Sequence, residues 1–210
     1  MSLFGNFGSE ELSIEDGGLI YYQQFFTSKE SDELYKYFLN EINWKQDYIN
    51  MFGKVIPLPR KTSWYGDKEA GYVYSGIKNT PNNWTDKLLY IKKKIEAECD
   101  NTFNSLLMNK YEDGKHKLSW HSDDEPELDK LCSIASLSFG SERNFSFKHK
   151  TKKDDPSTKA KKYNHTRILH HGSLLIMKPP MQEFWLHQVP ASKKVTKPRI
   201  NLTFRFVNNI

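Results

Sequence analysis

Four polar side chains near the C-terminus share one face of a predicted strand. Between Arg199 and Arg205 polar and apolar residues alternate without a break. Side chains two positions apart on a strand point the same way, so one face carries Arg199, Asn201, Thr203 and Arg205. Two guanidiniums on one face suit bidentate binding of a carboxylate or phosphate. The same alternation is typical of a half-exposed strand whose polar side meets water, but upstream residues favour an anion site.

A histidine and a carboxylate upstream have the spacing of metal ligands. His121 and Asp123 lie two residues apart, so both can reach one ion from an extended segment. Two histidines and one carboxylate leave positions open on Fe(II) for dioxygen chemistry, so a second histidine is needed. The candidates are His149, His165, His170, His171 and His187. His187 is favoured because it ends an aromatic strand twelve residues before Arg199, where an antiparallel partner strand would bring both into one pocket. For the other four, a structural role is the default interpretation.

The order of these motifs resembles the AlkB family of Fe(II)- and 2-oxoglutarate-dependent dioxygenases. The resemblance runs from about Asn50 to Val207. It implies that His121, Asp123 and His187 hold the iron, which 2-oxoglutarate chelates through its 2-oxo acid end before reaction with O2. It also implies that Arg199 binds the distal carboxylate. The rest of the cosubstrate pocket would be Asn109, Tyr111, Asn201, Thr203 and Arg205.

The resemblance implies an α+β fold with a double-stranded β-helix, or jelly-roll, core. Supporting helices are predicted at 28–44, with Ser28 as N-cap, and at 85–103. Short strands separated by turns, typical of a sandwich or barrel, are predicted at 105–111, 133–139, 144–149, 167–177, 183–188 and 199–207. We expect a flexible tail over 1–18 and one dioxygenase domain over 19–210, with a nucleotide-recognition lid at about 48–76 and a catalytic core at 105–207.

Charge and composition restrict the class of protein. The 210 residues suit one large domain, which we expect to be monomeric. Residues 148–167, the predicted basic hairpin loop, hold seven lysines and one arginine against two aspartates, which is a local charge of +6. Because the net charge of the chain is +5, the remaining residues sum to −1. Such a loop suits a phosphate backbone, although a solvated lysine-rich loop would look the same. Two cysteines and no signal-like or membrane-spanning run predict an intracellular protein, nuclear if the source is eukaryotic.

Within the family the chain most resembles the vertebrate duplex-DNA repair branch. The matching stretches are 52–54, 59–61, 65–67, 72–76, 121–125 and 170–175. By this resemblance Met51, Phe52 and Gly53, beside Lys54, form a finger that fills the base stack, although a buried hairpin tip is the alternative. Tyr74, on a strand with Tyr72 and Val73, would stack on a flipped base opposite His121.

Other residues are predicted to contact the substrate. Asp124 and Glu125 could accept hydrogen bonds from the exocyclic amino group of adenine or cytosine. Arg60 and the loop lysines would contact phosphates.

The predicted function is oxidative demethylation of 1-methyladenine and 3-methylcytosine in double-stranded DNA. This direct reversal repair releases formaldehyde, succinate and CO2. The alternatives are the same reaction on RNA or single-stranded nucleic acid, a nucleic-acid-binding jelly roll without catalysis, and protein hydroxylation.

Overall fold

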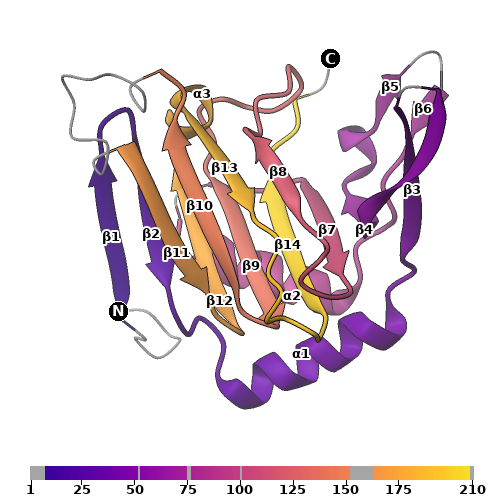
Figure 1. The fold of residues 1–210 in the computed structure, drawn as a ribbon, viewed down its shortest axis with the longest axis horizontal. Helices are drawn as coiled ribbons and strands as arrows, with labels where there is room; N and C mark the ends of the chain where they lie inside the picture. The colour runs from indigo at the N-terminus through magenta and orange to yellow at the C-terminus, as the bar shows by residue number, and fades with distance from the viewer. Residues whose placement is uncertain (1–7, 52, 75–76, 100, 152–162, 209–210) are drawn as a thin grey trace.

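The chain folds as two facing antiparallel sheets, in agreement with the predicted jelly roll (Figure 1). The computed structural model describes residues 8–51, 53–74, 77–99, 101–151 and 163–208. The larger sheet contains, in spatial order, β1 (Ser9–Ile14), β2 (Gly17–Tyr22), β12 (Ser173–Lys178), β9 (Ile134–Gly140), β14 (Arg199–Arg205), β7 (Ser105–Tyr111), β4 (Lys54–Gly66) and β3 (Lys45–Met51). The smaller sheet contains β11 (Asn164–Leu169), β10 (Arg143–His149), β13 (Trp185–Val189) and β8 (Leu118–His121).

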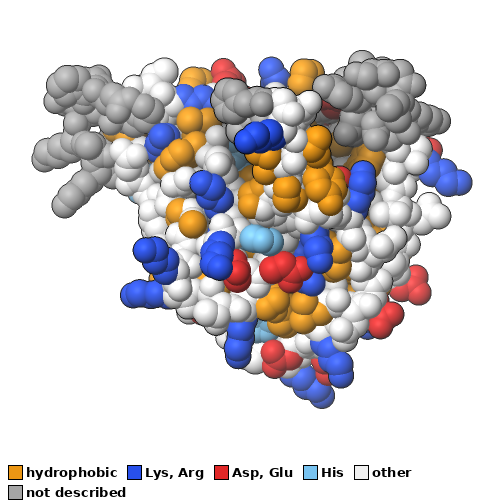
Figure 2. Space-filling model, turned by 45° about the vertical axis from the view of Figure 1, so that its right-hand side comes forward, with side chains coloured by type: hydrophobic (Ala, Val, Ile, Leu, Met, Phe, Trp, Pro, Cys, Tyr) orange, Lys and Arg blue, Asp and Glu red, His pale blue; other side chains and the backbone are white. Residues whose placement is uncertain are grey.

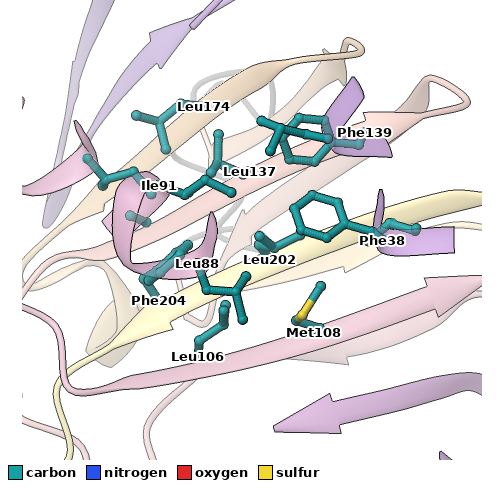
Figure 3. Packing of buried hydrophobic residues seen from close by; sticks show 14 of the residues in the cluster. Phe38, Leu88, Ile91, Leu106, Met108, Leu137, Phe139, Leu174, Leu202 and Phe204 are labelled. Carbon is teal, nitrogen blue, oxygen red and sulfur yellow. The ribbon is translucent and has the colours of Figure 1, made fainter. Parts of the chain in front are cut away.

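Helices cover the outer face of the larger sheet. Figure 3 shows Phe38 of α1 (Ser28–Glu41) and Leu88 of α2 (Asp86–Glu96) packed against sheet side chains that include Leu202. Both helices present apolar residues every three or four positions, which is the spacing of one helical face. These contacts form one core, while a second core lies between the sheets and contains Phe147, Leu175 and Trp185.

The alternation in β14 divides its side chains between these two regions. Ile200, Leu202 and Phe204 enter the helix-covered core. The polar residues of the strand therefore face the smaller sheet, and Arg199 is buried there. Burial excludes the interpretation of this strand as an ordinary half-exposed one.

Several predicted boundaries are wrong. The tail expected over 1–18 includes β1 and the start of β2, because Leu12 and Ile14 pack against the inter-sheet core. The strand predicted over 167–177 is two strands separated at Gly172, whose φ of +76° suits a turn. The segment 183–188 begins in the short helix α3 (Met181–Phe184). Both long helices end before the predicted residues, and the N-cap of α1 is Thr27.

The predicted lid is continuous with the larger sheet. Its β3–β4 hairpin projects from the sheet edge, while the second half of β4 pairs with β7. The short helix η1 (Lys68–Ala70) leads to the small hairpin of β5 (Tyr72–Tyr74) and β6 (Ile77–Asn79). On the other side, β10 and β11 form the predicted hairpin around the basic loop, of which residues 152–162 lie outside the description. No helix among the described residues is long and apolar enough to cross a membrane.

Candidate active site

Three potential metal ligands meet at one edge of the smaller sheet. His121 and His187 are directly opposite each other on the paired strands β8 and β13, and Asp123 follows β8. One ligand atom from each residue lies within 4.8 Å of the others. The predicted strand pairing is wrong, because β13 pairs with β10 and β8 rather than with β14. His187 and the arginines of β14 therefore approach each other from opposite sheets.

Neighbouring groups orient the three ligands. The Nδ1 of His121 is 2.8 Å from the carbonyl oxygen of Ser119, an arrangement that leaves Nε2 available for a metal. Gln182 accepts a hydrogen bond of 3.0 Å from the Asp123 backbone N–H. The His187 ring stacks on Phe145 with centroids 5.2 Å apart. Burial lowers the pKa of His187 to about 4, so the imidazole is neutral and can donate a lone pair.

Arg205 connects β14, the strand predicted to bind an anion, to this triad. Its guanidinium is in direct contact with the Asp123 carboxylate. Burial alone would raise the pKa of Asp123, but the positive charge of the Arg205 guanidinium, with smaller contributions from the neighbouring imidazoles, outweighs it and holds the pKa below its usual value. The carboxylate is therefore ionised and ready to bind a cation.

Arg199 is a buried cation whose hydrogen bonds are incomplete. Its side chain is 1 % exposed, and Nη2 donates to the Ser138 hydroxyl at 2.9 Å. The Tyr111 hydroxyl interacts with the guanidinium, but no hydrogen bond of normal geometry joins them, and Arg199 Nε and Nη1 have no partner among the described atoms. Burial lowers the pKa of Arg199 to about 10. A buried guanidinium with free N–H groups suits an incoming carboxylate.

Four of the predicted cosubstrate residues line a cavity beside the triad, whereas Arg199 and Tyr111, which pair across β14 and β7, are not among its lining residues. A cavity between the sheets is bounded by the three metal-ligand candidates together with Asn109, Asn201, Thr203 and Arg205. Asn201 donates to Ser136 at 3.0 Å and to the carbonyl of Leu137 at 2.9 Å. The donor set fits a 2-oxo acid, since imidazoles and a carboxylate suit iron at one end and a guanidinium suits an anion at the other.

Arg60 lies beside the triad, and its predicted phosphate contact stays a prediction. Arg60 Nε donates to Asn109 Oδ1 at 2.9 Å, and the side chain lines the cavity beside the triad. This follows from strand pairing, because Thr62 of β4 lies opposite Asn109 of β7. Arg60 therefore belongs to the interior of the site.

The predicted substrate contacts differ in placement. Glu125 lines the cavity, whereas Asp124 lies outside it and forms an ion pair of 3.1 Å with Lys150. Lys54 is exposed beside Gly53, whose φ of +74° forms the hairpin turn. Phe52 lies outside the described residues. Tyr72, Val73 and Tyr74 form β5, but their side chains are not described, so stacking opposite His121 stays a prediction.

One face of the molecule combines ionisable and apolar groups. Figure 2 shows a histidine side chain between acidic and basic side chains, below a group of hydrophobic side chains.

Sequence reasoning missed Gln182, Phe145 and the buried Arg143. The alternating apolar residues of β10 could have indicated Phe145, whereas Gln182 lies far from Asp123 in sequence and carries no local signal.

Comparisons with known proteins agree with this site. The model of the 2OG-Fe(II) oxygenase superfamily matches residues 18–205. The chain is 40% identical over 207 residues to mouse (Mus musculus) alpha-ketoglutarate-dependent dioxygenase alkB homolog 3, covering 95% of this chain and 71% of that protein. It is 36% identical over 187 residues to the mouse DNA oxidative demethylase ALKBH2, covering 88% and 78%.

A solved structure supports the fold. "The structure of OsALKBH1" aligns with a TM-score of 0.58 over 94% of this chain and 100% of that chain, at 16% identity. At this identity the likeness concerns the fold alone.

Proposed function

This chain belongs to the 2OG-Fe(II) oxygenase superfamily and, within it, to the AlkB family, and on this basis we propose that it demethylates alkylated bases in DNA. It is an Fe(II)- and 2-oxoglutarate-dependent dioxygenase that uses O2. The observation that carries the proposal is the contact between Arg205 of β14 and Asp123 of the metal-ligand triad. This contact joins the metal site to the strand that carries the proposed carboxylate-binding Arg199.

The proposed roles follow from this geometry. His121, Asp123 and His187 hold the iron, while the buried Arg199 binds the distal carboxylate of 2-oxoglutarate. The bound iron, 2-oxoglutarate and O2 supply the oxidation of an N-methyl group, which leaves as formaldehyde while 2-oxoglutarate becomes succinate and CO2.

The proposed substrates are 1-methyladenine and 3-methylcytosine. Both retain an exocyclic nitrogen beside the methyl group, and Glu125 in the cavity wall offers an acceptor for it. A relative is named a DNA oxidative demethylase, which supports DNA as the polymer. The lysines around the basic loop would then contact phosphates. We expect a monomer that acts inside the cell, and in the nucleus of a eukaryotic source.

A direct assay tests the proposal. The protein is incubated with Fe(II), 2-oxoglutarate and a duplex oligonucleotide carrying either methylated base, and formaldehyde and the repaired base are measured. Both should appear for the wild type and disappear for His187→Ala, whereas His165→Gln, on β11 two strands away from β13, should retain activity. Uncoupled 2-oxoglutarate turnover without repaired base would contradict nucleic-acid demethylation.

A second candidate is the same oxidation on RNA or single-stranded nucleic acid. A basic loop suits the phosphates of single and double strands alike, so this candidate is kept beside the duplex proposal. Rates on matched single and double strands decide between the two. Phe52→Ala should slow the duplex reaction more than the single-strand reaction if Phe52 fills the base stack.

A further inference from the structure

Arg143 is a second buried arginine near the proposed distal-carboxylate site. It opens β10, directly after the turn by which the chain leaves β9 and crosses to the smaller sheet. Gly140, at the end of β9, pairs with Arg199 of β14, so both arginines lie at the same end of the sandwich. The Arg143 side chain is 2 % exposed.

The guanidinium of Arg143 holds two loops together. It donates to the carbonyl oxygens of Asp113 and His116, at 3.3 and 2.8 Å, in the β7–β8 connection. It also donates at 2.7 Å to the carbonyl oxygen of Pro190, which follows β13. These loops connect the strands that carry Tyr111 and Arg199 to those that carry His121 and His187.

The two loops that Arg143 contacts are also hydrogen-bonded to each other. Gly114 donates to the carbonyl of Val195 at 2.9 Å and accepts from Ser192 at 2.8 Å. A Cβ at Gly114 would lie 1.9 Å from the Ser192 carbonyl oxygen, so the approach requires glycine. The end of the sandwich that holds Arg199 is therefore spanned by two loops that are hydrogen-bonded to each other and to Arg143.

Two cations meet at Tyr111 without a carboxylate. The Cζ atoms of Arg199 and Arg143 lie 5.3 and 6.0 Å from the centre of the Tyr111 ring. No carboxylate of the described residues forms an ion pair with either arginine, and Arg143 Nε has no hydrogen-bond partner among them. Two buried positive charges this close repel each other, and an anion bound between the sheets would relieve that repulsion.

We propose that Arg143 is a second cationic determinant of the cosubstrate site, selecting a 2-oxo acid with a negatively charged distal group. Arg199 contacts that group, and Arg143 acts through its charge across Tyr111 and through the loops that span this end. The proposal rests on the proposed role of Arg199. Arg143 is thus a positioning residue, at a distance from the reacting atoms.

Binding of two 2-oxo acids separates charge selection from general damage to the fold. Mn(II) replaces iron so that no turnover occurs, and dissociation constants are measured by calorimetry for 2-oxoglutarate and for 2-oxopentanoate, which has a methyl group in place of the distal carboxylate. Arg143→Gln should weaken 2-oxoglutarate binding roughly tenfold and leave 2-oxopentanoate binding nearly unchanged. Arg143→Lys should keep most of the preference, and Lys93→Gln on the exposed surface of α2 should change neither constant.

Equal weakening of both acids, or no change in either, would overturn the proposal. If Arg143→Gln does not fold, Arg143→Lys decides alone, because it keeps the charge but cannot hold three carbonyls in the same way. If Arg143→Lys no longer binds 2-oxoglutarate more tightly than 2-oxopentanoate, charge selection by Arg143 is refuted. Arg199→Gln tests the underlying assignment separately: unchanged 2-oxoglutarate binding there would refute the role of Arg199, whatever Arg143 does.

Discussion

The guanidinium of Arg205 contacts the carboxylate of Asp123, so the last residue of the anion-binding strand touches a metal ligand. The two residues come from different parts of the fold, β14 in the larger sheet and the segment after β8 in the smaller one. Because Asp123 is buried, this contact helps to keep it ionised before any metal binds. One ion pair therefore joins the predicted cosubstrate strand to the metal-ligand triad.

Replacement of Arg205 should damage the metal site. Arg205→Gln leaves the Asp123 carboxylate buried without its cation, which favours protonation of Asp123 and weakens metal binding. Breaking a buried pair by removing one partner should also lower the free energy of unfolding by about 3 kcal/mol. Mn(II) titration and urea denaturation measure the two effects, and Arg205→Lys should restore part of each. Unchanged metal affinity would show that Asp123 does not need the arginine.

Acid should destabilise the metal-free protein through His187. Its pKa falls from 6.5 to about 4 on folding because of burial, so below about pH 6.5 the unfolded chain binds a proton that the folded protein excludes. The free energy of unfolding should therefore fall as pH drops from about 6.5 to about 4, by on the order of 3 kcal/mol. Urea denaturation in the presence of a chelator measures this loss. His187→Gln should show a shallower dependence, and an equal slope in both proteins would assign the effect elsewhere.

Loss of Arg199 should affect the cosubstrate and spare the nucleic acid. Arg199→Ala removes the buried guanidinium proposed to bind the distal carboxylate, so half-maximal turnover should need roughly tenfold or more 2-oxoglutarate. Affinity for DNA, measured by fluorescence anisotropy, should remain nearly unchanged. A parallel loss of DNA affinity would place a phosphate at this arginine.

Arg60 should behave as a cavity residue in salt titrations. Each phosphate contact contributes about 0.9 to the slope of log affinity against log salt concentration. Since Arg60 Nε is bonded to Asn109, Arg60→Gln should leave the slope unchanged and raise the 2-oxoglutarate requirement several-fold. Lys54→Gln, at the exposed hairpin, is the matched variant and should reduce the slope. A reduced slope for Arg60→Gln would support the phosphate contact instead.

The two acidic neighbours of the triad should differ in effect. Glu125 lines the cavity, so Glu125→Gln should lower kcat/KM on methylated cytosine by roughly tenfold through loss of an acceptor. Asp124 is held by Lys150 outside the cavity, so Asp124→Asn should have a smaller effect. Steady-state kinetics on one oligonucleotide compares them. A larger effect of Asp124→Asn would require the ion pair to open during substrate binding.

The sequence predicted the parts of the site that depend on local spacing. Alternation in Arg199–Arg205 places four polar side chains on one face of a strand whatever surrounds it, and the two-residue spacing of His121 and Asp123 follows the same rule. The jelly-roll class also followed from the order of motifs, and the structure confirms it. The ends of individual helices and strands were harder to predict from sequence. The strand β1, for example, is stabilised by its pairing with β2.

Only the tertiary structure decided which distant groups meet. His187 reaches the triad through pairing with β8 rather than β14, Arg60 turns inward because β4 pairs with β7, and Arg143 holds loops that lie far from it in sequence. No local pattern encodes these contacts, because they depend on the order of strands within each sheet and on how the two sheets face each other. Side-chain spacing thus determined the chemistry available to this protein, and strand pairing determined which groups share one cavity.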